Sequence, residues 1–98
     1  MNKYTSDYKD KEIATLFFSG PYCGQCRLVK PRVEKDAESH PELNLCEVST
    51  GEEAGMDLAA EYGVTQLPTV VVLKKGIMHA KLVGAGQVSV KKILASTD

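Results

Sequence analysis

Two cysteines separated by two residues are the part of this sequence best suited to chemistry. Cys23 and Cys26 enclose Gly24-Gln25, and they follow a short apolar run that ends at Gly20-Pro21, a typical loop signal. A helix is predicted to begin at the cysteines. Free N–H groups at a helix start favour an anion. We therefore expect the pKa of the Cys23 thiol to lie below the value of about 8.5 for a free cysteine.

The spacing also suits a dithiol that can close to a disulfide. Two intervening residues place Cys26 one turn inside the predicted helix, close enough to Cys23 for an S–S bond. Cys23 would be the exposed thiolate that attacks a disulfide, and Cys26 the more buried thiol that resolves the mixed disulfide. Arg27 and Lys30 add positive charge to the first turns, where they either assist the thiolate or are solvated surface residues.

A metal site is the alternative use of a Cys-x-x-Cys pair. Further ligands would have to come from Cys46, His40 or His79, and none of these lies in a second Cys-x-x-Cys or in a His-x-x-x-His pattern. No metal is therefore expected. Cys46 falls in a predicted strand, where we interpret it as a small buried apolar residue.

Length and composition limit what the rest of the chain can do. The 98 residues predict one domain, residues 1–98, with a modest core. The 12 basic and 13 acidic residues nearly cancel, so no nucleic-acid partner is expected. No apolar run approaches the ~20 residues of a membrane span, and residues 1–11 are too polar for a secretory signal. An odd number of cysteines disfavours a disulfide-stapled secreted protein, so we expect a cytoplasmic protein without a membrane partner.

Hydrophobic patterns predict the elements that position the cysteines. Apolar runs predict a central strand over residues 13–19, a second strand over 43–48, and a hairpin of strands 69–73 and 77–83. Helical spacing predicts helices over residues 4–11, 26–39 (kinked at Pro31), 52–62 and 88–95. Thr50 and Glu53 have the spacing of a capping box. The order implies a parallel first strand pair, hence an α/β fold with a four-stranded mixed sheet flanked by helices.

From Ile13 onward the chain resembles the thioredoxin family, whose motifs recur here in the same order and spacing. The matching segments are Tyr22-Cys23-Gly24-Gln25-Cys26 for Trp-Cys-Gly-Pro-Cys, Pro31 for the helix-kinking proline, Tyr62 to Thr69 for the segment ending in Ile-Pro-Thr, and Val83-Gly84-Ala85. The resemblance implies a thioredoxin-like fold. Because only twelve residues precede Ile13, we expect the first edge strand of the family to be missing.

The resemblance implies a role for each matching residue. Pro68 would follow a cis peptide bond beside the cysteine pair, where the Leu67 backbone would pair with an extended segment of a target. The residues of the docking patch would be Tyr22, Gly24, Gln25, Leu67, Pro68, Val83 and Gly84. The chain would act as a monomer without a bound cofactor. Its partners would be disulfide-containing proteins, with a thioredoxin reductase or glutathione as electron donor.

Several positions depart from the family pattern. Phe17 replaces a buried aspartate six residues before the first cysteine, and Leu45 lies near the position of that aspartate's lysine partner. We therefore expect apolar residues in place of a buried charged pair, which leaves no assigned acceptor for the proton of the second cysteine. Gln25 replaces the proline between the cysteines. The chain contains no tryptophan, so Tyr22 replaces the family's aromatic residue before the first cysteine, and Ser19 replaces the aromatic residue further upstream.

The expected function is the reduction of protein disulfides through a reversible Cys23–Cys26 disulfide. Two alternatives remain open. A glutaredoxin-like enzyme that uses glutathione is favoured by the missing aspartate and by Tyr22, although the glycine-rich pair of glutaredoxins does not follow the last strand. A non-catalytic binding subunit with the thioredoxin fold would use the same apolar patch for a different purpose.

Overall fold

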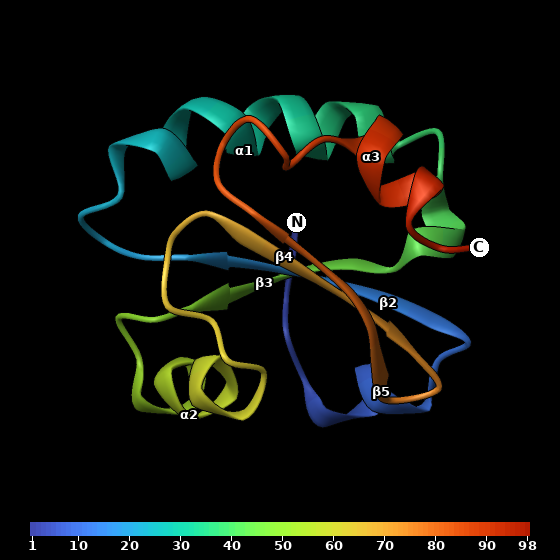
Figure 1. Cartoon of the computed structure of the whole chain (residues 1–98), viewed down its shortest axis with the longest axis horizontal. Coiled ribbons are helices and arrows are strands. Elements are labelled where there is room, and N and C mark those ends of the chain that lie inside the picture. Colours follow the sequence, from blue (N-terminus) through green and yellow to red (C-terminus); the bar gives the residue numbers. More distant parts are fainter.

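A five-stranded mixed sheet runs through the centre of the computed structural model, which describes residues 1–98 (Figure 1). In the order β1-β3-β2-β4-β5, the strands are Asn2–Lys3, Leu45–Ser49, Ile13–Ser19, Thr69–Lys74 and Ile77–Val83. β2 pairs parallel with β3, as the crossover predicted, and antiparallel with β4. β2 and β4 lie inside the sheet and are almost entirely buried, which explains their continuous apolar sequences.

Helices cover both faces of this sheet (Figure 1). α1 (Gly24–Ala37) and α3 (Val90–Ala95) lie on one face, and α2 (Glu53–Glu61) lies on the other. Two short 3-10 helices, η1 (Ser6–Asp10) and η2 (Pro41–Leu43), complete the chain. Each predicted helix is present with shifted ends, and the first is of the 3-10 type. None of the helices combines the length and the apolar character that crossing a membrane requires.

The expectation of a four-stranded sheet without its first edge strand is wrong. Asn2 and Lys3 form β1 and pair parallel with Cys46 and Glu47 of β3. The Tyr4 N–H extends this pairing by donating to the Glu47 carbonyl oxygen at 2.9 Å. A two-residue strand and a five-residue 3-10 helix fit into the segment before β2. Both side chains of β1 are exposed, so the strand leaves no hydrophobic pattern in the sequence.

Two apolar clusters hold the helices against the sheet. The cluster on the α2 face is formed by Tyr8, Ala14, Leu16, Phe18, Cys46, Val48, Ala59, Tyr62, Val71 and Leu73. The cluster on the α1 and α3 face is formed by Phe17, Val33, Leu43, Val70, Val72, Val88, Val90 and Ile93. Side chains alternate between the faces along a strand. Ser19 therefore points to the α1 face like Phe17, whereas Phe18 points to the α2 face.

The predicted capping box at α2 is also wrong. α2 begins at Glu53 with Glu52 as its N-cap residue, and no side chain caps it. The Thr50 hydroxyl instead donates to the Ser19 carbonyl oxygen at 3.0 Å, and the Thr50 N–H donates to the same oxygen at 2.8 Å. Thr50 thus ties the end of β3 to the end of β2, at the point where the cysteine loop leaves the sheet.

The predicted hairpin of the last two strands is confirmed, and its turn is tight. Lys75 and Gly76 connect β4 to β5 with φ angles of 51° and 81°. Two consecutive positive φ values are typical of the two-residue hairpin turn whose twist matches that of the flanking strands. Glycine suits the second position because it adopts positive φ without steric strain.

Candidate active site

Cys23 and Cys26 are joined by a disulfide at the N-terminal end of α1, with their Cα atoms 5.3 Å apart. Cys23 is the N-cap residue of the helix, and its sulfur accepts a hydrogen bond from the Cys26 backbone N–H at 3.1 Å. The Cys23 side chain is half-buried, whereas Cys26 is only 3% exposed. The two sulfurs therefore have the unequal access to solvent that the sequence predicted.

The N-cap position has a chemical consequence for the reduced protein. A backbone N–H donor and the positive end of the helix stabilise a Cys23 thiolate more than the thiol. The first turn of α1 holds no acidic residue that would oppose this effect. Arg27 lies in the same turn, with its guanidinium 3.5 Å from the Pro21 carbonyl oxygen. The local structure thus favours the form of Cys23 that attacks disulfides.

The segment that contains Pro68 is held against the end of β5. The Leu67–Pro68 peptide bond is cis, as the resemblance implied. The Gly84 N–H donates to the Pro68 carbonyl oxygen at 2.9 Å, and Thr69 pairs with Val83 in the antiparallel ladder. Gly84 has a φ of 94°, in the region that favours glycine. These contacts bring the two segments that the sequence singled out to one end of the sheet.

An open hollow of about 470 Å³ lies beside the disulfide. Its lining residues are Gly20, Pro21, Tyr22, Cys23, Thr50, Thr65 and Leu67, none of them charged. The structure thus brings Cys23, Tyr22 and Leu67 together around one space. Of the other predicted docking residues, Gly24 and Gln25 are exposed on α1, and neither Val83 nor Gly84 lines the hollow. The Tyr22 side chain is 96% exposed at the rim.

A charged cluster that the sequence analysis missed lies next to Phe17, on the α1 face. Glu47 is the register partner of Phe17 in the parallel strand pair, whereas Leu45 pairs two residues earlier. Lys30 Nζ lies 2.9 Å from Glu47 Oε1, and the Ser19 hydroxyl donates to Glu47 Oε2 at 2.8 Å. The expectation that apolar residues replace the charged pair is therefore only half right. Phe17 is fully buried, but an ion pair lies beside it.

Glu47 stays ionised although it is partly buried. Burial raises the pKa of its carboxyl group, but the hydrogen bonds from Lys30 and Ser19 and the charge of Lys30 outweigh burial, so the pKa falls below its usual value of 4.5. The sequence holds one signal of this pair. Lys30 lies at helical spacing between Cys26 and Val33, which are both buried, and a charge on a buried stripe requires a partner.

The third cysteine and the two histidines lie outside this site. Cys46 is fully buried, as predicted, and burial raises the pKa of its thiol to about 12. His40 Nδ1 lies 3.5 Å from a Glu42 carboxylate oxygen, and His79 Nε2 lies 2.8 Å from the Asp98 carbonyl oxygen. No three potential metal ligands of the chain come together.

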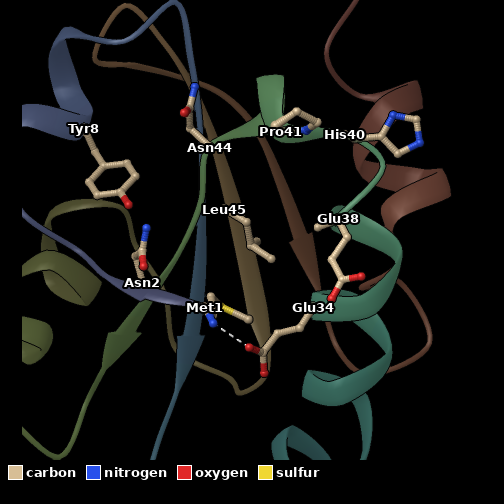
Figure 2. A pocket seen from close by; sticks show the side chains of 10 residues that line it. Met1, Asn2, Tyr8, Glu34, Glu38, His40, Pro41, Asn44 and Leu45 are labelled. Atoms are coloured by element: carbon tan, nitrogen blue, oxygen red, sulfur yellow. Dashed lines mark hydrogen bonds and ion pairs between the residues drawn. The ribbon is translucent and has the colours of Figure 1, made fainter.

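A second hollow lies at the opposite end of α1 (Figure 2). It is formed by the last turns of the helix, by η2 and by the first residues of the chain, and its carboxylate at Glu34 binds the Met1 amino group. It contains no cysteine. The C-terminal end of α1 lies roughly 20 Å along the helix from the disulfide, so this hollow is not part of the candidate active site.

Comparisons with known proteins match nearly the whole chain. The family model described as Thioredoxin matches residues 2–96. Thioredoxin-1 of Saccharomyces cerevisiae is 27% identical over 95 residues, which cover 97% of this chain and 90% of that protein. The thioredoxin of Pyropia yezoensis is 36% identical over 80 residues, covering 82% and 71% of the two chains. The X-ray structure of Fasciola hepatica thioredoxin aligns with a TM-score of 0.77 at 29% identity, covering 93% and 85%.

Proposed function

Because this chain belongs to the thioredoxin family, we propose that it is a thiol–disulfide oxidoreductase that reduces protein disulfides. One observation carries the proposal. The half-buried sulfur of Cys23 lies at the N-cap of α1, bonded to the buried sulfur of Cys26, at the edge of an uncharged hollow. A dithiol in this position supplies both a nucleophile and the group that ends the reaction.

The proposed reaction consists of two exchange steps. The Cys23 thiolate attacks a target disulfide, so a Cys23–target S–S bond forms, the target's own S–S bond breaks, and the leaving thiolate takes a proton from solvent. The Cys26 thiol then loses its proton and attacks the Cys23 sulfur. The Cys23–Cys26 bond forms and the second target thiolate leaves. An external thiol donor afterwards returns two electrons to the disulfide.

The Leu67 backbone supports a role in docking. Neither its N–H nor its carbonyl oxygen makes a backbone hydrogen bond within the chain. Both groups are therefore free to pair with an extended segment of a target, as in strand addition. We propose that this pairing aligns the target sulfur with Cys23. The surrounding patch would be completed by Tyr22, Gly24, Gln25, Pro68, Val83 and Gly84.

A reductase assay tests the proposal and separates it from its alternatives. The protein is mixed with insulin and dithiothreitol, and precipitation of the released chain is followed by turbidity. We expect faster precipitation than with dithiothreitol alone, and no acceleration by Cys23→Ser. An inactive natural chain would instead support a non-catalytic binding subunit.

The electron donor distinguishes a thioredoxin from a glutaredoxin-like enzyme. We propose that a thioredoxin reductase supplies the electrons in the cytoplasm, where the reducing thiol pool suits a catalytic rather than a structural disulfide. NADPH with a thioredoxin reductase is compared with NADPH, glutathione and glutathione reductase. Turnover with the first system supports the proposal, whereas turnover with glutathione alone supports the glutaredoxin-like alternative.

A further inference from the structure

The second exchange step requires the Cys26 thiol to lose a proton. Cys26 is 3% exposed, and burial in apolar surroundings disfavours the thiolate. Phe17, which lies six residues before Cys23, is fully buried and cannot accept a proton. Some other group near the buried face of α1 must therefore take the proton, or the step must wait for rare access of solvent.

The face of α1 that turns Cys26 toward the sheet also holds Lys30. The two residues lie four positions apart, on the same face of the helix. Val33, three positions further, is buried on that face. Lys30 therefore reaches toward the sheet rather than toward solvent, and its ammonium group meets Glu47 of β3 at 2.9 Å. A carboxylate thus lies between α1 and the sheet, on the same side as the Cys26 sulfur.

Ser19 fixes the other oxygen of this carboxylate. Ser19 is 6% exposed, and its hydroxyl donates to Glu47 Oε2 at 2.8 Å. It is the last residue of β2, and residues 20–22 lead from it directly to Cys23. The hydrogen bond therefore holds the carboxylate at the end of the sheet from which the cysteine loop departs.

We propose that Glu47 accepts the Cys26 proton in the second exchange step, with Ser19 as a positioning residue and Lys30 as the countercharge that keeps the carboxylate ionised. The inference rests on the proposed function. The proton passes from the Cys26 thiol to the Glu47 carboxylate, and the thiolate attacks the Cys23 sulfur. The Cys23–Cys26 bond forms, the Cys23–target bond breaks, and the target leaves as a thiolate. Glu47, whose side chain is 25% exposed, then returns the proton to solvent.

The charged groups around Lys30 and Glu47 keep the Glu47 carboxylate ionised and therefore able to accept a proton. Lys30 and, at longer range, the Met1 amino group hold the pKa of Glu47 below its usual value, so the carboxylate is free of a proton at neutral pH. Four other charged side chains of the neighbouring elements have partners of their own: Arg27 the Pro21 carbonyl, Lys3 the Glu52 carboxylate, Glu34 the Met1 amino group, and Lys92 the Gly86 carbonyl.

A two-phase reaction with an aromatic disulfide separates the two exchange steps. Reduced protein is mixed with 5,5′-dithiobis(2-nitrobenzoate), so that attack by Cys23 releases a first coloured thiolate and resolution by Cys26 releases a second. Glu47→Gln keeps the shape of the side chain and removes its charge. We expect its second phase to slow about tenfold or more at pH 7, with an unchanged first phase. We also expect recovery as the pH rises and Cys26 ionises without an acceptor.

Lys30→Met is the matched variant, because it removes the other member of the ion pair. Without Lys30 the Glu47 carboxylate is a stronger base. The second phase of Lys30→Met should therefore be as fast as in the natural chain or faster. The reverse pattern, a fast Glu47→Gln and a slow Lys30→Met, would overturn the proposal and assign the effect to the positive charge of Lys30. An unchanged second phase in Glu47→Gln would overturn it as well.

Two controls keep the test independent of folding and of the proposed function. Thermal denaturation of each variant shows whether it folds. If Glu47→Gln does not, Ser19→Ala removes only one hydrogen bond to the carboxylate and should slow the second phase severalfold, and an unchanged second phase would count against the proposal. If the natural chain shows neither phase, the proposed function itself fails. If the first phase is normal and the second phase does not depend on Glu47, only the proposal that Glu47 accepts the proton is rejected, and the proposed function remains.

Discussion

The backbone N–H of Cys26 donates a hydrogen bond to the sulfur of Cys23 at 3.1 Å, across the first turn of α1. The residue that resolves the reaction therefore also stabilises the residue that starts it. The same turn provides the positive end of the helix, and it contains no acidic side chain. The backbone thus favours the thiolate of Cys23, whereas Cys26 is buried.

The first prediction concerns the selectivity of the thiols. Limiting iodoacetamide at pH 6.5 should alkylate Cys23 of the reduced protein well before Cys26 or Cys46, because only Cys23 combines access with a helix start. Peptide mass spectrometry identifies the labelled residue. Cys46 is the internal control, since burial raises its pKa to about 12. Equal labelling of all three thiols would contradict the structural assignment.

The second prediction concerns the exposed aromatic ring beside the nucleophile. Tyr22→Ala should raise KM for a protein disulfide severalfold and leave the rate with a small disulfide unchanged, because the 96% exposed ring contacts targets rather than the core. Its stability should stay within about 0.5 kcal/mol of the natural chain. Ile77→Ala is the matched control, since Ile77 is 74% exposed at the distal hairpin and should not affect KM. A KM that responds equally to both substitutions would rule out a local docking role.

The third prediction concerns the close approach of α2 to β3. A Cβ atom at Gly55 would lie 1.8 Å from the Ser49 carbonyl oxygen, so Gly55→Ala must displace the helix. Alanine at a helical position usually stabilises, by about 0.5–1 kcal/mol, but here we expect a loss of about 1–3 kcal/mol. Urea denaturation measures the change. Gly86→Ala, where a Cβ meets nothing within 4 Å, should be nearly neutral, and similar results for both variants would contradict the packing.

The fourth prediction concerns the pH dependence of the Lys30–Glu47 pair. The pKa of Glu47 is lower in the folded chain than in the unfolded chain, so its contribution to stability is present above the unfolded value and is lost as the pH falls through the folded value. Glu47→Gln should therefore cost about 1 kcal/mol at pH 7 and much less at pH 3. Denaturation curves at both pH values measure this difference. A cost that is the same at pH 3 and pH 7 would show that the loss is not ionic.

The strands and helices that pack against the core could be predicted from the sequence, because burial leaves a pattern. β2 and β4 are continuous apolar runs, and Cys26 and Val33 mark the buried stripe of α1. β1 left no such pattern, because its two residues pair only through the backbone. The remaining contacts depend on the register between strands, which a single amino-acid sequence does not reveal.

The candidate site likewise combines features that the sequence predicts with features that it does not. The position of the two cysteines at a helix start follows from local signals, and the structure confirms it. The predicted cap is absent because α2 begins at Glu53, which places Glu52 and not Thr50 at the N-cap, and the Thr50 hydroxyl donates to the Ser19 carbonyl oxygen. The contact between Lys30 and Glu47 depends on the register between β3 and β2, which the sequence does not reveal. The sequence therefore predicted apolar residues where the structure has an ion pair.

The most direct test of the disulfide-exchange mechanism is to stop it halfway. Cys26→Ser retains the proposed nucleophile but cannot resolve a mixed disulfide. Incubated with a disulfide-containing protein, it should form a covalent adduct through Cys23 that intact-mass spectrometry detects and that dithiothreitol releases, while the Cys23→Ser variant should form none. Absence of the adduct, or attachment through Cys46 instead, would contradict the mechanism.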